Sequence, residues 1–176
     1  GLEASCVLGL RDDAKALGLD AEHTAKLENV AAATLLLEEL LARQQRQGSQ
    51  SVLDGTALHN TAYPEAISLV HGHCHQKATG AMKAMRRVLK MINNHDFEII
   101  DSGCCGMAGS FGLEHEHHEM AKTMAELALL PALQAHPGRR IVANGFSCRQ
   151  QIRAHSSHQP VHLAQVLAAI LPERQP

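Results

Sequence analysis

Residues 66–75 read AISLVHGHCH, so a short apolar strand runs directly into a loop that carries a cysteine. The same order returns twice, because FEII at 97–100 precedes SGCCGMAGSFG at 102–112, and RIVA at 140–143 precedes NGFSC at 144–148. Helical patterns cover residues 79–92, 114–135, 148–155 and 162–171. This order predicts an α/β fold, a Rossmann-like βαβαβα unit with a short parallel sheet and flanking helices.

The segment before this unit is expected to contain one long helix. Residues 20–47 keep mostly helical spacing of Leu, Val and Ala, and no Gly or Pro interrupts them. Residues 1–10 resemble the end of a strand followed by a loop with Cys6, and their abrupt start suggests a piece of a longer chain. Residues 47–64 are rich in Gly, Ser, Gln, Asn and Thr, which predicts a linker.

Composition and charge narrow the functional classes. Hydrophobic residues make up 45% of the 176 residues, which is typical of a globular domain. The formal net charge of −2 argues against a basic face for a nucleic-acid partner and against a polybasic membrane anchor. No apolar run reaches the roughly 20 residues that cross a bilayer. We therefore expect a cytoplasmic protein without a transmembrane segment, whose association with the inner face of the membrane would be peripheral.

Four of the five cysteines follow the predicted strands. Cys74, the adjacent pair Cys104 and Cys105, and Cys148 each lie just beyond the carboxyl end of one strand. Parallel strands bring these ends to one edge of a sheet, where open α/β folds bind ligands. An odd number of cysteines with an adjacent pair favours metal or redox chemistry over a disulfide framework. We therefore predict one metal site built from these four thiols.

Thiolates bind both zinc and iron–sulfur clusters, and the spacing of the cysteines in the sequence helps to distinguish these two cofactors. Structural zinc sites usually take ligands in pairs a few residues apart, whereas here the only close pair is adjacent. Neighbouring thiolates fit more readily onto a cluster with several irons. An iron–sulfur cluster, 4Fe-4S in type, is therefore the favoured cofactor, and zinc in a structural module is the alternative.

Residues around the cysteines are expected to support the cofactor. Gly103, Gly106 and Gly109 would allow unusual backbone angles and a close approach of the main chain to a bulky group. Lys77 and Arg149 each lie close to a cysteine in the sequence and would supply positive charge that raises the reduction potential.

Several other readings of these residues stay open. His73 or His75 is a candidate hydrogen-bond donor or replacement ligand, although alternation keeps the histidines of 71–75 from all facing one site. The histidines of 115–118 are expected on a solvated face, and His162 is expected to pack or to cap the last helix. The glycine-rich loop does not fit the dinucleotide fingerprint. Thiol–disulfide catalysis at the adjacent pair would proceed without metal.

Three motifs together resemble a known family. HCHQK at 73–77, SGCCGMAGSFG at 102–112 and SCRQQI at 147–152 resemble the cysteine-rich CCG domain of heterodisulfide reductase and of the iron–sulfur subunits that serve glycolate and glycerol-3-phosphate oxidation. The resemblance is strongest to the C-terminal iron–sulfur region of FAD-linked D-2-hydroxyacid dehydrogenases. Some members of the family have a further cysteine where this chain has Gln151.

The resemblance implies a place for the chain in a larger oxidoreductase. Residues 57–176 would be the second of two repeats, and residues 1–56 the tail of the first repeat, with Cys6 left without partners. By the resemblance, FAD lies in a flavin-containing dehydrogenase domain or subunit outside this sequence. The module would accept electrons from that flavin and pass them to a quinone or another acceptor, and the fragment alone would not be catalytic.

Overall fold

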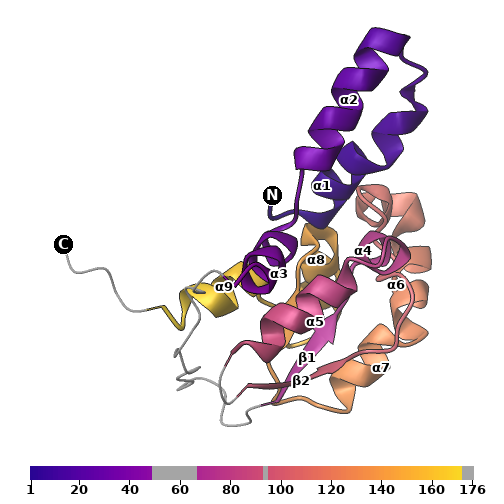
Figure 1. Cartoon of the computed structure of the whole chain (residues 1–176). Coiled ribbons are helices and arrows are strands. Elements are labelled where there is room, and N and C mark those ends of the chain that lie inside the picture. The colour runs from indigo at the N-terminus through magenta and orange to yellow at the C-terminus, as the bar shows by residue number, and fades with distance from the viewer. Residues whose placement is uncertain (49–66, 93–94, 172–176) are drawn as a thin grey trace, which may run out of the picture.

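A parallel sheet of three strands organises the chain, and helices pack on both of its faces (Figure 1). The computed structural model describes residues 1–48, 67–92 and 95–171. Before the sheet come α1 (Ala4–Arg11), the 3-10 helix η1 (Asp13–Leu17), α2 (Ala21–Ala33) and α3 (Leu37–Arg46). The sheet unit comprises β1 (Ile67–His71), α4 (Cys74–Ala78), α5 (Met82–Lys90), β2 (Asp96–Ile99), η2 (Phe111–Leu113), η3 (His115–His117), α6 (His118–Glu126), α7 (Leu129–Gln134), β3 (Ile141–Ala143), α8 (Phe146–His155) and α9 (Leu163–Ala168). The predicted α/β class is confirmed.

Strand β1 lies in the centre, because the strand order is β2-β1-β3 and all pairings are parallel. Val70 lies opposite Ile99 of β2 and opposite Val142 of β3. Side chains alternate between the faces of a strand. Accordingly, Val70 and Val142 belong to one hydrophobic cluster, whereas Leu69 and Ile141 belong to another.

Each face of the sheet has its own core. The first cluster joins the sheet to α3, α5 and α9 through Ala42, Met82, Met85, Val88, Leu89, Leu163, Val166 and Leu167. The second cluster joins it to α6, α7 and α8 through Ala125, Leu129, Leu130, Leu133 and Ile152, and it includes Cys105 and Cys148. Two of the predicted ligands are therefore buried within the core of one face.

The N-terminal residues form a helix, so the prediction of a strand end and loop over residues 1–10 was wrong. Glu3 caps α1 by accepting from the Ser5 amide. Ala4 and Leu8, four residues apart on one face of α1, are fully buried in a small cluster with Leu36. Burial against a residue distant in the sequence stabilises this short helix, so the local sequence pattern does not predict it.

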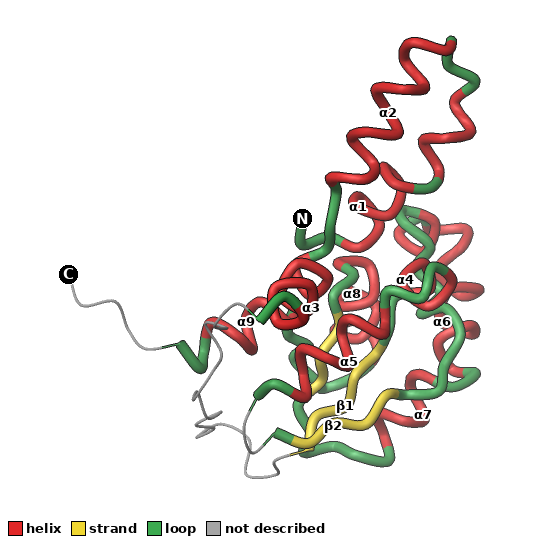
Figure 2. Tube along the Cα trace, in the orientation of Figure 1, coloured by secondary structure: helices red, strands yellow, loops and turns green. Residues whose placement is uncertain are grey.

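The predicted long helix over residues 20–47 is helical but consists of two helices, α2 and α3. The chain is extended at Leu36, whose side chain is fully buried and whose amide donates to Glu39 Oε2 at 2.9 Å. The new helix therefore starts after Leu36 with its own cap. Helix α2 buries none of its residues and extends away from the sheet (Figure 2).

The helical stretch predicted over 114–135 is also divided, into 3-10 turns, α6 and α7. Pro131 lies in the first turn of α7. It has no N–H to donate to the preceding turn, and its ring would collide with that turn, so one continuous helix cannot run through it. The predicted linker over 47–64 falls almost wholly outside the described residues, and so does the predicted domain boundary after residue 56. In the described part, no helix combines the length and apolar character needed to cross a membrane.

Candidate metal centre

The carboxyl ends of the three strands meet at one edge of the sheet, and the segment that follows each strand carries cysteine. Cys74 begins α4 after β1, Cys104 and Cys105 lie in the loop after β2, and Cys148 lies in the first turn of α8 after β3. Helix α5, after β1, packs on one face, whereas α8, after β3, packs on the other. Such a switch between neighbouring strands opens the crevice in which α/β folds bind ligands.

The four thiols are neighbours in space, as their positions at the sheet edge predicted. Side-chain interactions join Cys74 to Cys104, Cys104 to Cys105, and Cys105 to Cys148. Cys74 is exposed and Cys104 partly buried, whereas Cys105 and Cys148 are buried. The thiols therefore form a row that runs from solvent into the core.

The proton affinities of these thiols reflect their crowding. Burial, followed by the neighbouring Cys104, raises the pKa of the Cys74 thiol. The hydrogen bond with Cys105, followed by burial, raises the pKa of Cys104 well above its usual range. For Cys105, a hydrogen bond with Cys104 lowers the pKa, but the bond to Cys148 and burial outweigh it and raise the pKa to about 12. Thiolates this close together need a cation to balance their charge.

The loop around the adjacent cysteines is shaped by glycine. Gly106 has a φ of 90°, and its amide donates to Cys104 Sγ at 3.3 Å. A Cβ at this position would lie 2.0 Å from the carbonyl oxygen of Ala121 in α6. Gly109 also has a positive φ, whereas Gly103 does not, and both have open space where a Cβ would be. Glycine at position 106 therefore allows the loop to pack closely against α6.

The two predicted basic residues hold the loops that carry the cysteines. Lys77 Nζ donates to the carbonyl oxygens of Ser102 and Gly103, directly before Cys104. Arg149 donates to the carbonyl oxygens of Ala143 and Asn144 at 2.9 and 2.6 Å, at the end of β3. Each cation thus fixes the backbone beside one part of the thiol row.

His71 is a site residue that the sequence reasoning missed. It is the last residue of β1 and only 1% exposed, and one of its ring nitrogens lies within 4.8 Å of Cys105 Sγ and Cys148 Sγ. Its Nδ1 lies 3.0 Å from Ser102 Oγ, while Nε2 has no hydrogen-bond partner. The signal in the sequence is a polar residue within an otherwise buried apolar strand.

The other candidate residues have different surroundings. His73 caps α4 by accepting from the His75 amide at 3.3 Å, and His75 lies 3.3 Å from Asp12 near the surface. Cys6 is exposed on α1. The histidines at 115 and 118 are exposed as expected, while His117 is half-buried and stacks on Phe111 with ring centres 4.0 Å apart. His162 caps α9, which confirms its expected role.

The fold and the row of thiols define the chain as an α/β domain with a cysteine-rich site at the carboxyl edge of its sheet. Comparison with known proteins adds that its curated homologues are dehydrogenases. Over 74 residues it is 38% identical to D-2-hydroxyglutarate dehydrogenase of Escherichia coli (strain K12), a match that covers 42% of this chain and 7% of that protein. The protein of the same name from Haemophilus influenzae is 32% identical over 69 residues, which are 39% of this chain and 7% of that protein.

A second kind of relative is a component of the anaerobic glycerol-3-phosphate dehydrogenase of Escherichia coli (strain K12). It is 25% identical over 101 residues, which are 57% of this chain and 25% of that component. The resemblance to dehydrogenases drawn from the cysteine motifs is thus confirmed, while the chain accounts for only a small share of these relatives. No protein-family model matches the sequence. No solved structure matches it either.

Proposed function

We propose that the chain is an electron-transfer module of a larger FAD-linked dehydrogenase. Cys74, Cys104, Cys105 and Cys148 would hold an iron–sulfur cluster, 4Fe-4S in type. The observation that carries this proposal is that thiols from three segments, each following a different strand, form one row at the sheet edge. The names of the relatives supply the second support, because both kinds are dehydrogenases or parts of one.

The chemistry of the site fits such a group. When bound, an iron–sulfur cluster takes up and releases single electrons. The Gly106 amide would stabilise negative charge on Cys104, as it already donates to that sulfur. Lys77 and Arg149 would hold the surrounding loops and place positive charge nearby, which raises the reduction potential. The exposed Cys74 would form the end of the site nearest to a partner.

The wider setting is part of the same proposal. Electrons would come from a flavin that oxidises a 2-hydroxyacid elsewhere in the protein or in a partner subunit, and would leave to a quinone or another acceptor. Residues 57–176 would be the second CCG repeat and residues 1–56 the tail of the first. The module would work in the cytoplasm or at the inner face of the membrane.

Zinc is the alternative occupant, because the same soft donors bind it. Thiol–disulfide catalysis has less support, since reactive cysteines have a lowered pKa, whereas the pKa of Cys104 and of Cys105 is raised. The donor set therefore favours a metal over bare thiol chemistry.

The test is metal and sulfide analysis, with paramagnetic resonance, on full-length protein purified without oxygen. We expect iron and acid-labile sulfide, and a paramagnetic signal that appears or disappears on reduction. Cys105→Ser should abolish it, whereas Cys6→Ser, at the exposed thiol on α1, should leave it intact. Protein that contains zinc in place of iron, colourless and silent to reductant, would overturn the proposal.

A further inference from the structure

The buried end of the thiol row contains a nitrogen with no partner. Within the described residues, a ring nitrogen of His71 and the sulfurs of Cys105 and Cys148 lie within 4.8 Å of one another, and all three residues are buried. No hydrogen bond joins His71 Nε2 to either sulfur or to any other described atom. An orphaned polar atom inside a core is unfavourable, so its retention at this site needs an explanation.

The second ring nitrogen is arranged as in metal-binding histidines. Nδ1 lies 3.0 Å from Ser102 Oγ, and an Nδ1–H donated to that hydroxyl leaves a lone pair on Nε2. Ligating histidines usually bind one partner through the nitrogen that faces away from the metal, which fixes ring and tautomer. The imidazole must be neutral to bind a metal through Nε2.

We propose that Nε2 of His71 is a nitrogen ligand of the metal centre, beside Cys105 and Cys148. This inference rests on the proposed function. Each iron of a 4Fe-4S cluster takes one ligand from the protein, so Nε2 would bind one iron in place of one of the four thiols. Ligand atoms of one centre lie near one another without hydrogen bonds between them, which matches the position of the imidazole. The buried end of the site would then carry mixed sulfur and nitrogen ligands, and its exposed end sulfur alone.

The test is pulsed paramagnetic resonance on full-length protein prepared without oxygen and labelled with ¹⁵N-histidine. We expect a strong hyperfine coupling to a directly bound imidazole nitrogen. His71→Ala should remove this coupling completely, and the exposed His115→Ala should retain it. The wild-type spectrum decides whether a nitrogen is bound, and a cluster signal that remains in His71→Ala shows that this variant still folds around the centre.

Two results would overturn the inference, and they differ in what else they overturn. A cluster signal with only weak nitrogen coupling, or with a strong coupling that survives His71→Ala, removes His71 as a ligand but leaves the proposed function standing. Protein without iron removes both proposals together.

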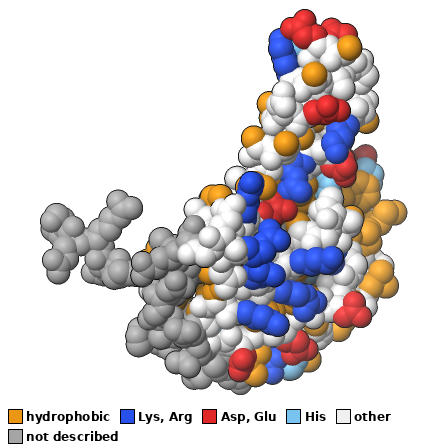
Figure 3. Space-filling model, in the orientation of Figure 1, with side chains coloured by type: hydrophobic (Ala, Val, Ile, Leu, Met, Phe, Trp, Pro, Cys, Tyr) orange, Lys and Arg blue, Asp and Glu red, His pale blue; other side chains and the backbone are white. Residues whose placement is uncertain are grey.

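Helices α3 and α5 together form a basic face. Six exposed cations lie on these two helices: Arg43, Arg46, Lys83, Arg86, Arg87 and Lys90. Lys and Arg side chains gather on this part of the surface in Figure 3. Within the described ranges none of the six has an ion-pair partner. The net charge of −2 therefore conceals a local basic face.

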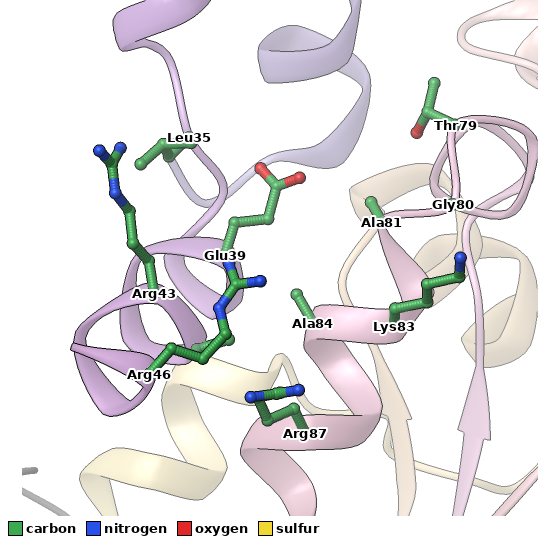
Figure 4. Close-up of a pocket in the computed structure, with 11 residues that line it drawn as sticks. Leu35, Glu39, Arg43, Arg46, Thr79, Gly80, Ala81, Lys83, Ala84 and Arg87 are labelled. Carbon is green, nitrogen blue, oxygen red and sulfur yellow. The ribbon is translucent and has the colours of Figure 1, made fainter. Parts of the chain in front are cut away.

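Part of this face is hollowed. A recess of about 500 Å³ lies between α3, α5 and the turn at 79–81, with Arg43, Arg46, Lys83 and Arg87 among its lining residues (Figure 4). The acidic side chain in this lining, Glu39, is neutralised by Arg11 at 2.5 Å. The recess therefore presents an excess of positive charge.

The positive charges around the recess indicate which kind of partner it would bind. Unpaired cations gathered on one face attract an opposing negative surface and steer its approach. Residues 49–66 of this chain contain only two acids, Asp54 and Glu65, too few to match six cations. The recess is lined by small residues such as Ala81 and Ala84, with no aromatic side chain to insert among lipids. Carboxylate side chains of a partner protein fit it better than a membrane does.

The position of the recess connects it with the thiol row. Its turn at 79–81 directly follows α4, whose first residue is the exposed Cys74. A helix of five residues is about 7 Å long, so a partner seated in the recess would lie beside the exposed end of the site. We infer that this basic recess docks an acidic protein surface that exchanges electrons with the centre.

The test measures binding of poly-L-glutamate to the full-length protein at low and high salt. Arg43→Glu with Arg87→Glu should weaken binding at least tenfold, while the matched pair Lys15→Glu with Lys122→Glu, outside the recess, should change it little. Equal binding by both double variants would overturn the inference. So would tight binding of phosphatidylglycerol vesicles or of inorganic phosphate without binding of poly-L-glutamate.

Discussion

At the scale of single residues, Gly106 is the most constrained position beside the thiols. Its φ of 90° disfavours any side chain, and a Cβ would collide with the Ala121 carbonyl oxygen at 2.0 Å. The Cys104 sulfur depends on the same residue for its amide donor. The protein alone therefore fixes the backbone of this loop, without a bound ligand.

Gly106→Ala should lower the free energy of unfolding by about 3 kcal/mol or more, because backbone strain adds to a clash with main chain that cannot move aside. Gly109→Ala is the matched control, since its φ of 70° is also positive but its Cβ would meet nothing within 4 Å. It should lose only about 1 kcal/mol. Urea unfolding of the metal-free protein measures both, and equal losses would refute the assigned contact.

His162 shows how a buried imidazole ties local structure to pH. Its Nδ1 accepts from the Ala164 amide at 2.9 Å, so Nε2 carries the proton and donates to the Leu2 carbonyl oxygen at 2.9 Å. Burial is the main cause that lowers its pKa from 6.5. Protonation would destroy the cap at Nδ1.

The unfolded chain therefore binds this proton before the folded chain does, and the free energy of unfolding should fall as pH drops below about 6.5. His162→Asn keeps an oxygen for the cap but removes the titrating group. The variant should lose less stability than the wild type between about pH 7.5 and 5.5 in thermal unfolding. An unchanged pH dependence would show that His162 is not the group responsible.

At the scale of elements, the strands could be predicted and the helix boundaries could not. Each strand is a short apolar run, and β1, β2 and β3 lie within one residue of the predicted segments at either end. The cysteines follow those strands, so the edge of the sheet could be predicted with them. The break at Leu36 depends on burial of its side chain, which no local pattern reports.

The same limit applies to two parts of the site. His71 stands in a run of alternating histidines, and only the tertiary arrangement shows which of them faces the sulfurs. The basic recess joins α3 to α5, which are separated by more than thirty residues of mixed charge. Total charge carries no information about such a local gathering.

Helix α1 provides the element-scale test, because its stability is assigned to packing. Leu8→Ala should cost about 2–5 kcal/mol, since this side chain is fully buried against Leu36 and Ala81. Leu10→Ala, at a position 41% exposed on the same helix, should cost less than about 0.5 kcal/mol. Chemical unfolding distinguishes them, and similar small losses would mean that α1 does not pack on the domain in solution.

At the scale of the whole molecule, the fold places the thiols and the cations on different elements. The sheet edge gathers thiols from the segments after three strands into a row that reaches from the core to the exposed Cys74. The outer surface of α3 and α5 gathers cations beside that exposed end. The proposed electron-transfer centre would need both a protected interior and an accessible face.

The most direct measurement of the central claim is X-ray absorption at the iron edge of protein purified without oxygen. We expect a first coordination shell dominated by sulfur in the wild type, and loss of iron in Cys105→Ser. Iron surrounded only by oxygen and nitrogen, or a sulfur shell that persists unchanged after that substitution, would contradict it.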